Sequence, residues 1–202
     1  MQTIEKAVTM TENNETTTDR AGVRAKDHAS MAVVLAAASI AWFTWGHQGG
    51  EISGWLEAGM GAGLLALIAA IVVMRGIRVA PSLAFDPAIR KVYWTSVIAE
   101  IVLIVGGVIV LNLIGQSAYL STWTLAIVGL HFLPFVKAFR APLLRWTAVA
   151  CVVVAGIALW AGLAGWAPAP TIAGAGGGLV LLGFALLLMR EARSQRPAMP
   201  VS

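Results

Sequence analysis

Residues 92–136 read VYWTSVIAEIVLIVGGVIVLNLI, then GQSA, then YLSTWTLAIVGLHFLPFV. Two apolar runs are joined here by residues 115–118, and the basic residues Lys91 and Lys137 stand at their far ends. Each run is close to the about 17–25 residues with which an α-helix crosses about 30 Å of hydrocarbon. A connection this short joins only antiparallel neighbours. The segment therefore predicts a transmembrane helical hairpin.

The rest of the chain repeats this pattern on both sides of the hairpin. The apolar runs cover residues 29–45, 55–74, 92–114, 119–136, 146–166 and 171–189. Hydrophobic residues make up 58% of the chain and charged residues 12%, which leaves no long polar segment for a separate soluble domain. The predicted fold class is all-α, an integral membrane bundle of six transmembrane helices with short outer loops.

The cations predict the orientation of this bundle. All 14 Lys and Arg residues lie in the two tails and in the gaps after the second and fourth runs, and none lies in the other three gaps. By the positive-inside rule, both termini are expected in the cytoplasm. Trp residues favour the boundary between water and lipid. Six are expected near the outer ends of the spans and two near the inner ends: Trp42, Trp45, Trp55, Trp123, Trp160 and Trp166, then Trp94 and Trp146.

Three regions follow from these boundaries. Residues 1–28 are polar and mixed in charge without an apolar core, so we expect a disordered cytoplasmic tail and no signal peptide. Residues 29–189 form the six-helix transmembrane domain, and residues 190–202 form a second cytoplasmic tail. Between the second and third runs, Asp86-Pro87 is a helix-start signal, because Asp caps free N–H groups and Pro is tolerated in the first turn. The third helix is therefore expected to begin at Pro87.

The second and sixth runs each carry a Gly-xxx-Gly face near the outer end. The glycines are Gly59 and Gly63 in one run and Gly174 and Gly178 in the other, at an offset of 115 residues that suggests a parallel duplication. Such faces let helix backbones approach closely. Two uses remain open, packing within one subunit and a seam between two copies of the chain.

Only three strongly ionisable residues lie within the runs, namely Glu57, Glu100 and His131. Ionisable groups inside a membrane are costly unless they are paired or face water, which makes them functional candidates. Glu57 is close enough to the outer end to reach the interface. Glu100 lies 17 residues before Ser117 at the hairpin tip and His131 lies 14 residues after it. At 1.5 Å per residue their heights differ by about 4.5 Å, so we predict a hydrogen-bonded pair inside the protein.

Two further residues complete the candidate polar or ligand site. Ser96 lies one turn before Glu100, on a face that also carries Gly107 and is expected to point into the bundle. Pro134 follows His131 by three residues and is expected to kink the fourth helix. The pair could relay a proton, anchor a small substrate, or clamp two helices together; burial and mutual attraction oppose each other, so its protonation state stays open.

Other chemistry is disfavoured. The chain has no nucleophile elbow, phosphate-binding loop, zinc-protease motif or Cys-x-x-Cys motif. His28, His47 and His131 are scattered, and the single Cys151 is expected to serve packing. No enzyme activity, cofactor, metal site or nucleic-acid partner is therefore expected. The basic excess suits the lipid bilayer, with anionic headgroups at the cytoplasmic face.

The segment Val128-Gly129-Leu130-His131-Phe132-Leu133-Pro134, with Glu100 one helix earlier and Lys137 and Arg140 after it, resembles a pattern in small bacterial multipass membrane proteins of unknown function. The resemblance implies a bacterial cytoplasmic (inner) membrane location and groups Glu100, His131 and Pro134, but it implies no activity. Six spans in a chain of this size also resemble the substrate-binding subunits of energy-coupling vitamin importers. Their small-residue docking motif is echoed loosely by Ala32, Ala36, Ala37 and Ala41.

From the sequence alone, we expect a membrane scaffold or accessory subunit, with a membrane-protein partner or as a homo-oligomer. The alternative is a small proton-linked or small-molecule transporter that uses Glu100 and His131. The two hypotheses differ in one structural respect. A dry bundle, sealed on both sides of the pair, favours a scaffold, whereas a cavity that reaches the pair favours transport.

Overall fold

The computed structural model describes the backbone of residues 2–50, 54–77 and 87–195, and the side chains of 21–50, 54–77 and 87–195. Within these ranges all regular structure is helical. The long helices are α1 (Gln2–Gly46), α2 (Gly54–Arg75), α3 (Pro87–Leu113), α4 (Leu120–Ala138), α5 (Leu143–Leu163) and α6 (Ala169–Ser194). Short 3₁₀ turns follow α1 and precede α4, at η1 (His47–Gly49) and η3 (Ser117–Tyr119). Six helices are long and apolar enough to cross a membrane, as is typical of a multi-pass membrane protein.

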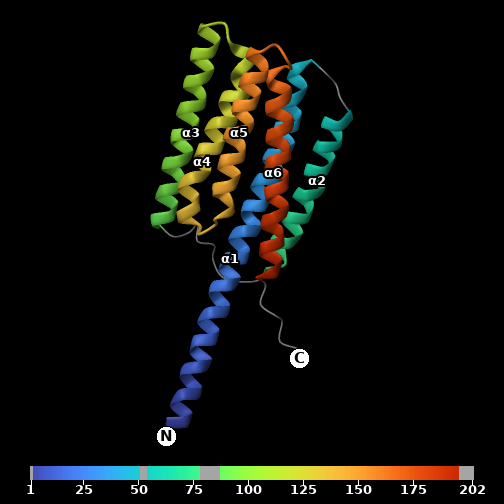
Figure 1. Cartoon of the computed structure of the whole chain (residues 1–202). Helices are drawn as coiled ribbons and strands as arrows, with labels where there is room; N and C mark the ends of the chain where they lie inside the picture. Colours follow the sequence, from blue (N-terminus) through green and yellow to red (C-terminus); the bar gives the residue numbers. More distant parts are fainter. Residues whose placement is uncertain (1, 51–53, 78–86, 196–202) are drawn as a thin grey trace.

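The helices form one bundle with α3 at one edge and α2 at the other (Figure 1). We call one end of this bundle the basic end, because Arg75, Lys91, Lys137, Arg145 and Arg190 all lie at the helix termini there. The C-terminal end of α6 lies at this end, and α1 enters the bundle there (Figure 1). The turns η1 and η3 lie at the opposite end. Helix α3 begins at Pro87, as the sequence predicts.

The glycine faces of α2 and α6 both pack against α1 in the same chain. A Cβ atom at Gly59 would lie 2.5 Å from the ring of Phe43, and one at Gly178 would lie 2.8 Å from the same ring. Phe43 is therefore wedged between two helices that can approach α1 only because they present glycine there. Gly63 makes a similar contact, 2.8 Å from Ile40 and Ser39 of α1.

Gly174 brings two backbones together at the opposite end of the bundle. A Cβ atom at Gly174 would collide with the backbone of Gly46 and lie 2.7 Å from the carbonyl oxygen of Trp42. The α1–α6 pair is accordingly the most extensively packed pair in the described bundle. All four glycines of the two Gly-xxx-Gly faces are thus used in contacts within the chain.

Helix α3 is held almost entirely by α4. Every residue of α3 is described, and only Gly107 among them is buried. The indole of Trp123 lies against Gly107, where a Cβ atom would collide with it, and its Nε1 donates a hydrogen bond to the Leu103 carbonyl at 3.0 Å. This contact fixes the height of one helix of the hairpin against the other.

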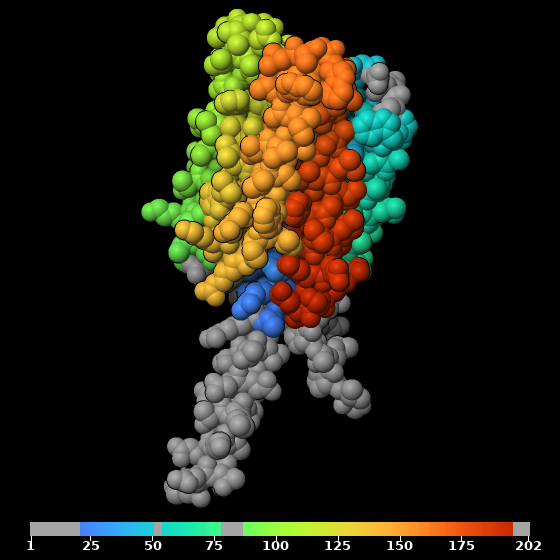
Figure 2. All heavy atoms as spheres, viewed as in Figure 1, coloured from blue at the N-terminus to red at the C-terminus, as the bar shows by residue number. Residues whose placement is uncertain are grey.

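Residues 21–28 and 190–194, which the sequence analysis assigned to the two tails, are packed as helix in the structure. Residues 21–28 continue α1 as helix, with Ala25, Asp27 and His28 buried, and α6 continues to Ser194. The reason is a small second core at the basic end, in which α1, α6 and the end of α2 pack together. Its buried members are Ala25, Ala29, Val73, Ile77 and Ala192. In Figure 2 the first described side chains of α1, in blue, lie directly beside the red end of α6.

The Trp residues divide into two groups. Trp94 and Trp146 are exposed at the basic end, and Trp55, Trp160 and Trp166 are exposed at the opposite end, as expected for boundary residues. Trp42 differs, because it is only 5% exposed and belongs to the main core. It stacks on Trp45 with 5.1 Å between ring centroids. Trp42 thus lies near the end of α1, as predicted, but it faces the core, because Gly177 of α6 makes room for its ring.

Candidate functional site

Glu100 and His131 are in contact. Nδ1 of His131 lies 3.2 Å from Oε2 of Glu100, and the two side chains are 11% and 19% exposed, respectively. The proximity predicted from the residue count across the hairpin is therefore present. Its geometry differs from the prediction, because His131 Nδ1 has no aligned hydrogen-bond partner among the described residues. The two atoms lie within ion-pair distance, but the contact lacks the alignment of a hydrogen bond.

The hairpin turn and the Trp123 contact together fix the height of Glu100 relative to His131. Gly115 adopts a left-handed backbone with φ of +71°, and the Gln116 amide then donates to the Leu111 carbonyl at 2.7 Å. This closes the end of α3 and turns the chain into α4. Together with the hydrogen bond from Trp123, the turn leaves little freedom for α3 to slide along α4.

An aromatic cluster surrounds His131 on the basic side. The imidazole lies edge-on to Phe135, with 4.6 Å between centroids and 82° between planes. Phe135 stacks in turn on Tyr93 of α3, at 5.7 Å and 13°, and meets Phe139 edge-on at 5.6 Å. These contacts fix the imidazole orientation beside Glu100 through packing.

A crevice of about 220 Å³ adjoins this cluster. It is lined by Asp27, Ser30, Met31, Val34, Leu35, Tyr93, His131, Phe132, Phe135, Phe139 and Leu144. These residues come from α1, α3, α4 and α5. The crevice exists because α1 and α4 are not a closely packed pair, although each packs against α6.

The crevice opens sideways on the bundle. At its mouth, Val34 is 62% exposed and Tyr93 is 41% exposed. Its floor is formed by the buried side chains of Asp27, Leu35 and Leu144. A cavity thus reaches His131, whereas Glu100 contacts His131 without lining the cavity itself.

The two other predicted site residues lie apart from this cavity. Ser96 is partly buried one turn before Glu100, but it is not among the residues that line the crevice. Pro134 lies within α4, which continues as α-helix to Ala138, and its side chain is exposed. Because Pro134 has no N–H group, the carbonyl of Leu130 lacks its usual helical donor. Neither residue touches the Glu100 carboxylate in any contact recorded for the described chain.

A second histidine–carboxylate pair lies at the basic end. Nδ1 of His28 is 3.3 Å from Oε2 of Glu191, with side chains 4% and 38% exposed. The neighbouring Asp27 is only 2% exposed and lines the crevice. These three residues were not predicted as site residues, because residues 1–28 and 190–202 were assigned to tails. Small residues at helical spacing, Ala21, Ala25, Ala29, Ala32 and Ala36, are the signal that extends α1 inward.

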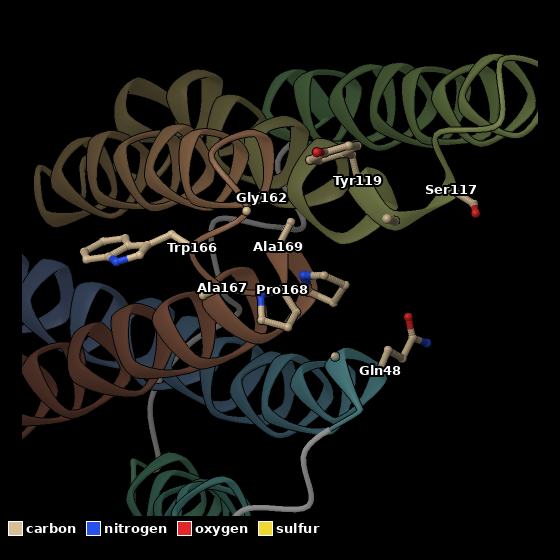
Figure 3. Close-up of a pocket in the computed structure, with 12 residues that line it drawn as sticks. Gln48, Ser117, Tyr119, Gly162, Trp166, Ala167, Pro168 and Ala169 are labelled. Atoms are coloured by element: carbon tan, nitrogen blue, oxygen red, sulfur yellow. The ribbon is translucent and has the colours of Figure 1, made fainter.

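A separate hollow of about 660 Å³ lies at the opposite end, among the turns (Figure 3). Its wall includes Gln48, Ser117, Tyr119 and Trp166, and none of its lining residues is Asp, Glu, Lys, Arg or His. Trp42 and Leu125 belong to the core between this hollow and the crevice, and both are buried. Glu57 is exposed at the start of α2, as expected for an interfacial residue.

The described residues contain no group of three or more His, Cys, Asp or Glu side chains that could hold a metal ion. Cys151 is buried in α5, where a Cβ atom at Gly129 of α4 would lie 3.0 Å from it. Its place is a packing contact between two helices. Comparison of the chain with protein-family models, with curated proteins and with solved structures gives no match.

Proposed function

We propose that this protein is a small membrane carrier that takes a small amphiphilic molecule into the crevice, with His131 and Glu100 as its polar anchor. One observation supports the proposal above all: the crevice of about 220 Å³ is lined by His131, which contacts Glu100. Two residues that serve only as a clamp between α3 and α4 need no cavity beside them. The cavity therefore favours transport over the scaffold that the sequence alone suggested.

The proposed setting is the bacterial cytoplasmic membrane, with the basic end and both termini in the cytoplasm. The distribution of Lys and Arg supports this orientation. The exposed cations of the basic end, such as Arg75 and Lys137, would then meet anionic headgroups. In this orientation the crevice lies in the cytoplasmic half of the bilayer and opens toward lipid, so an amphiphilic ligand enters it from within the membrane.

Movement of the α3–α4 hairpin would carry the ligand across. The hairpin contacts α1 only loosely, but its α4 packs extensively on α5, so in the proposed carrier α5 moves with the hairpin relative to α1 and α6. Toward the opposite end, α1 and α4 continue into the main core, to which the buried residues Trp42 and Leu125 belong. Protonation changes the net charge of the His131–Glu100 pair. In the proposed carrier, ligand binding is therefore coupled to protonation of the pair.

A scaffold or accessory subunit remains the second candidate, because of the exposed surface of α3. Apart from Gly107, no residue of this fully described helix is buried. A partner membrane protein or a second copy of the chain could pack there. This function predicts a stable complex that survives purification, and it needs no ligand in the crevice.

The carrier hypothesis is tested by filling the mouth of the crevice. Val34→Trp adds a bulky ring at the mouth, and Val72→Trp is the matched control on the exposed surface of α2, where Val72 is 65% exposed. Purified variants in lipid nanodiscs are titrated with a fluorescent amphiphile that brightens in apolar surroundings. We expect Val34→Trp to abolish saturable binding and Val72→Trp to retain it. Saturable binding that is equal in both variants would exclude the crevice as the site.

A further inference from the structure

The crevice has an acidic character. Among the described residues that line it, Asp27 supplies a carboxylate and His131 an imidazole, and none of them is Lys or Arg. Glu100 contacts His131 from α3, so a second carboxylate lies next to the wall. Asp27 is 2% exposed, and at such a buried site the attraction between a carboxylate and a cation is weakly screened by water.

Aromatic rings supply the remainder of the wall. Tyr93, Phe132, Phe135 and Phe139 all line the crevice. The faces of aromatic rings carry partial negative charge and attract organic cations, most strongly where water is excluded. Neither an anion nor a strongly hydrated metal ion gains from such a wall. An organic cation with an apolar body gains from both the rings and the carboxylates.

The volume limits the size of this ligand. About 220 Å³ is below the roughly 300–1,000 Å³ of pockets that take drug-sized molecules. A single ring or a short branched chain attached to an ammonium group is of suitable size. The open mouth at Val34 leaves space for a longer apolar tail to project out of the crevice.

We propose that the crevice selects a lipophilic organic cation, either a protonated amine or a quaternary ammonium with a small apolar body. This inference rests on the proposed carrier function and specifies its substrate class. The ammonium group lies between Asp27 and the rings of Tyr93 and Phe135, beside the His131–Glu100 pair that anchors it. The apolar body lies against Leu35 and Leu144, which form the floor.

A pair of probes of equal shape isolates the effect of charge. Benzyltrimethylammonium carries a quaternary nitrogen, and neopentylbenzene replaces that nitrogen with carbon and is neutral. The readout is protection of a cysteine at the crevice from a maleimide, in the variant Ser30→Cys combined with Cys151→Ala, reconstituted in lipid nanodiscs. Ser30 lines the crevice, and Cys151 is the sole natural cysteine.

We expect benzyltrimethylammonium to slow labelling at least tenfold and neopentylbenzene to leave it unchanged, although the neutral probe enters lipid more readily. Asp27→Asn should weaken protection by the cation about tenfold, while Asp27→Glu should retain most of it. Glu57→Gln, which removes an exposed acid at the far end of the bundle, should have no effect.

Two other results would overturn the inference. Equal protection by the cation and the neutral probe would show that the crevice binds apolar molecules without regard to charge, which leaves the carrier function standing. Protection by neither probe would reject the organic cation as the ligand. If the parent protein also shows no saturable dye binding, the carrier function is rejected as well. The comparison of probes is made in the Ser30→Cys protein with Asp27 in place, so it does not depend on whether the Asp27 variants fold.

Discussion

His28 of α1 and Glu191 of α6 meet at the basic end, with 3.3 Å between Nδ1 and Oε2. The contact joins the first and the last helix of the bundle, beyond the ends of their apolar stretches. It also places Asp27, the residue before His28, on the side of α1 that faces the crevice. One polar contact thereby influences both the stability of the bundle and the position of the crevice floor.

We expect the contact between His28 and Glu191 to stabilise the α1–α6 pair modestly. A double-mutant cycle with His28→Asn and Glu191→Gln should give a coupling free energy of about 0.6 kcal/mol and at most about 1.7 kcal/mol, as for other polar contacts between membrane helices. The measurement is unfolding of the purified protein in detergent. Arg193→Gln, an exposed charge on the same helix, should give additive effects with His28→Asn. Additivity between His28→Asn and Glu191→Gln themselves would contradict the prediction.

The α3–α4 contact can be tested with two adjacent glycines. Gly107→Ala places a methyl group into the Trp123 indole and should reduce the free energy of unfolding by about 1–3 kcal/mol, as overpacking does. Gly106→Ala meets nothing within 4 Å and should be neutral or stabilising by up to about 1 kcal/mol. Thermal unfolding of the two variants side by side measures the difference. Similar melting temperatures for both would show that Trp123 does not set the packing of α3.

Phe43 offers a rescue experiment for the glycine faces. Gly178→Ala brings a methyl group to 2.8 Å from the Phe43 ring, which cannot retreat because Gly59 of α2 lies on its other side. We expect a loss of about 1–3 kcal/mol in the free energy of unfolding. The second substitution Phe43→Leu should recover part of that loss, because it removes the ring. Gly183→Ala, with open space around it, is the control. A lack of recovery in the double variant would place the strain elsewhere.

The pair of Glu100 and His131 has to be tested for stability and ligand binding at once. Glu100→Gln and His131→Asn should each weaken saturable binding of the fluorescent amphiphile at least tenfold. Their cost in free energy of unfolding should not exceed about 2 kcal/mol, the range of a polar contact between membrane helices. Dye titration and thermal unfolding of the same samples separate the two effects. Stability lost with binding intact would identify the pair as a clamp between helices only.

The helices and the Glu100–His131 contact could be predicted because they depend on local patterns. Apolar length gives the spans, Pro87 marks the start of α3, and a short turn fixes relative height along a hairpin. A count of residues from Ser117 was therefore sufficient to bring Glu100 and His131 to one level. The direction of the contact was not predictable, because rotamers depend on neighbours such as Phe135.

The crevice and the second pair could not be predicted in the same way. His28 and Asp27 are polar residues beside a polar segment, and only their packing against α6 shows that they are buried. The crevice arises from the distance between α1 and α4, which are far apart in the sequence. Both helices pack against α6, and the approach of α1 to α6 depends on glycine, as at Gly174. Hydropathy alone does not determine it, as the buried Trp42 also shows.

The short turn between α3 and α4 also bears on how the chain is made. An acidic side chain near the centre of a lone helix costs about 2.5–3.5 kcal/mol during insertion by the translocon. Because α3 packs almost entirely against α4, we expect the two helices to enter the bilayer as one unit. Glu100 would then be in contact with His131 during insertion. A longer turn at Gly115 would allow α3 to enter the bilayer before α4. In the proposed membrane setting, the hairpin would deliver Glu100 to the bilayer together with its partner His131.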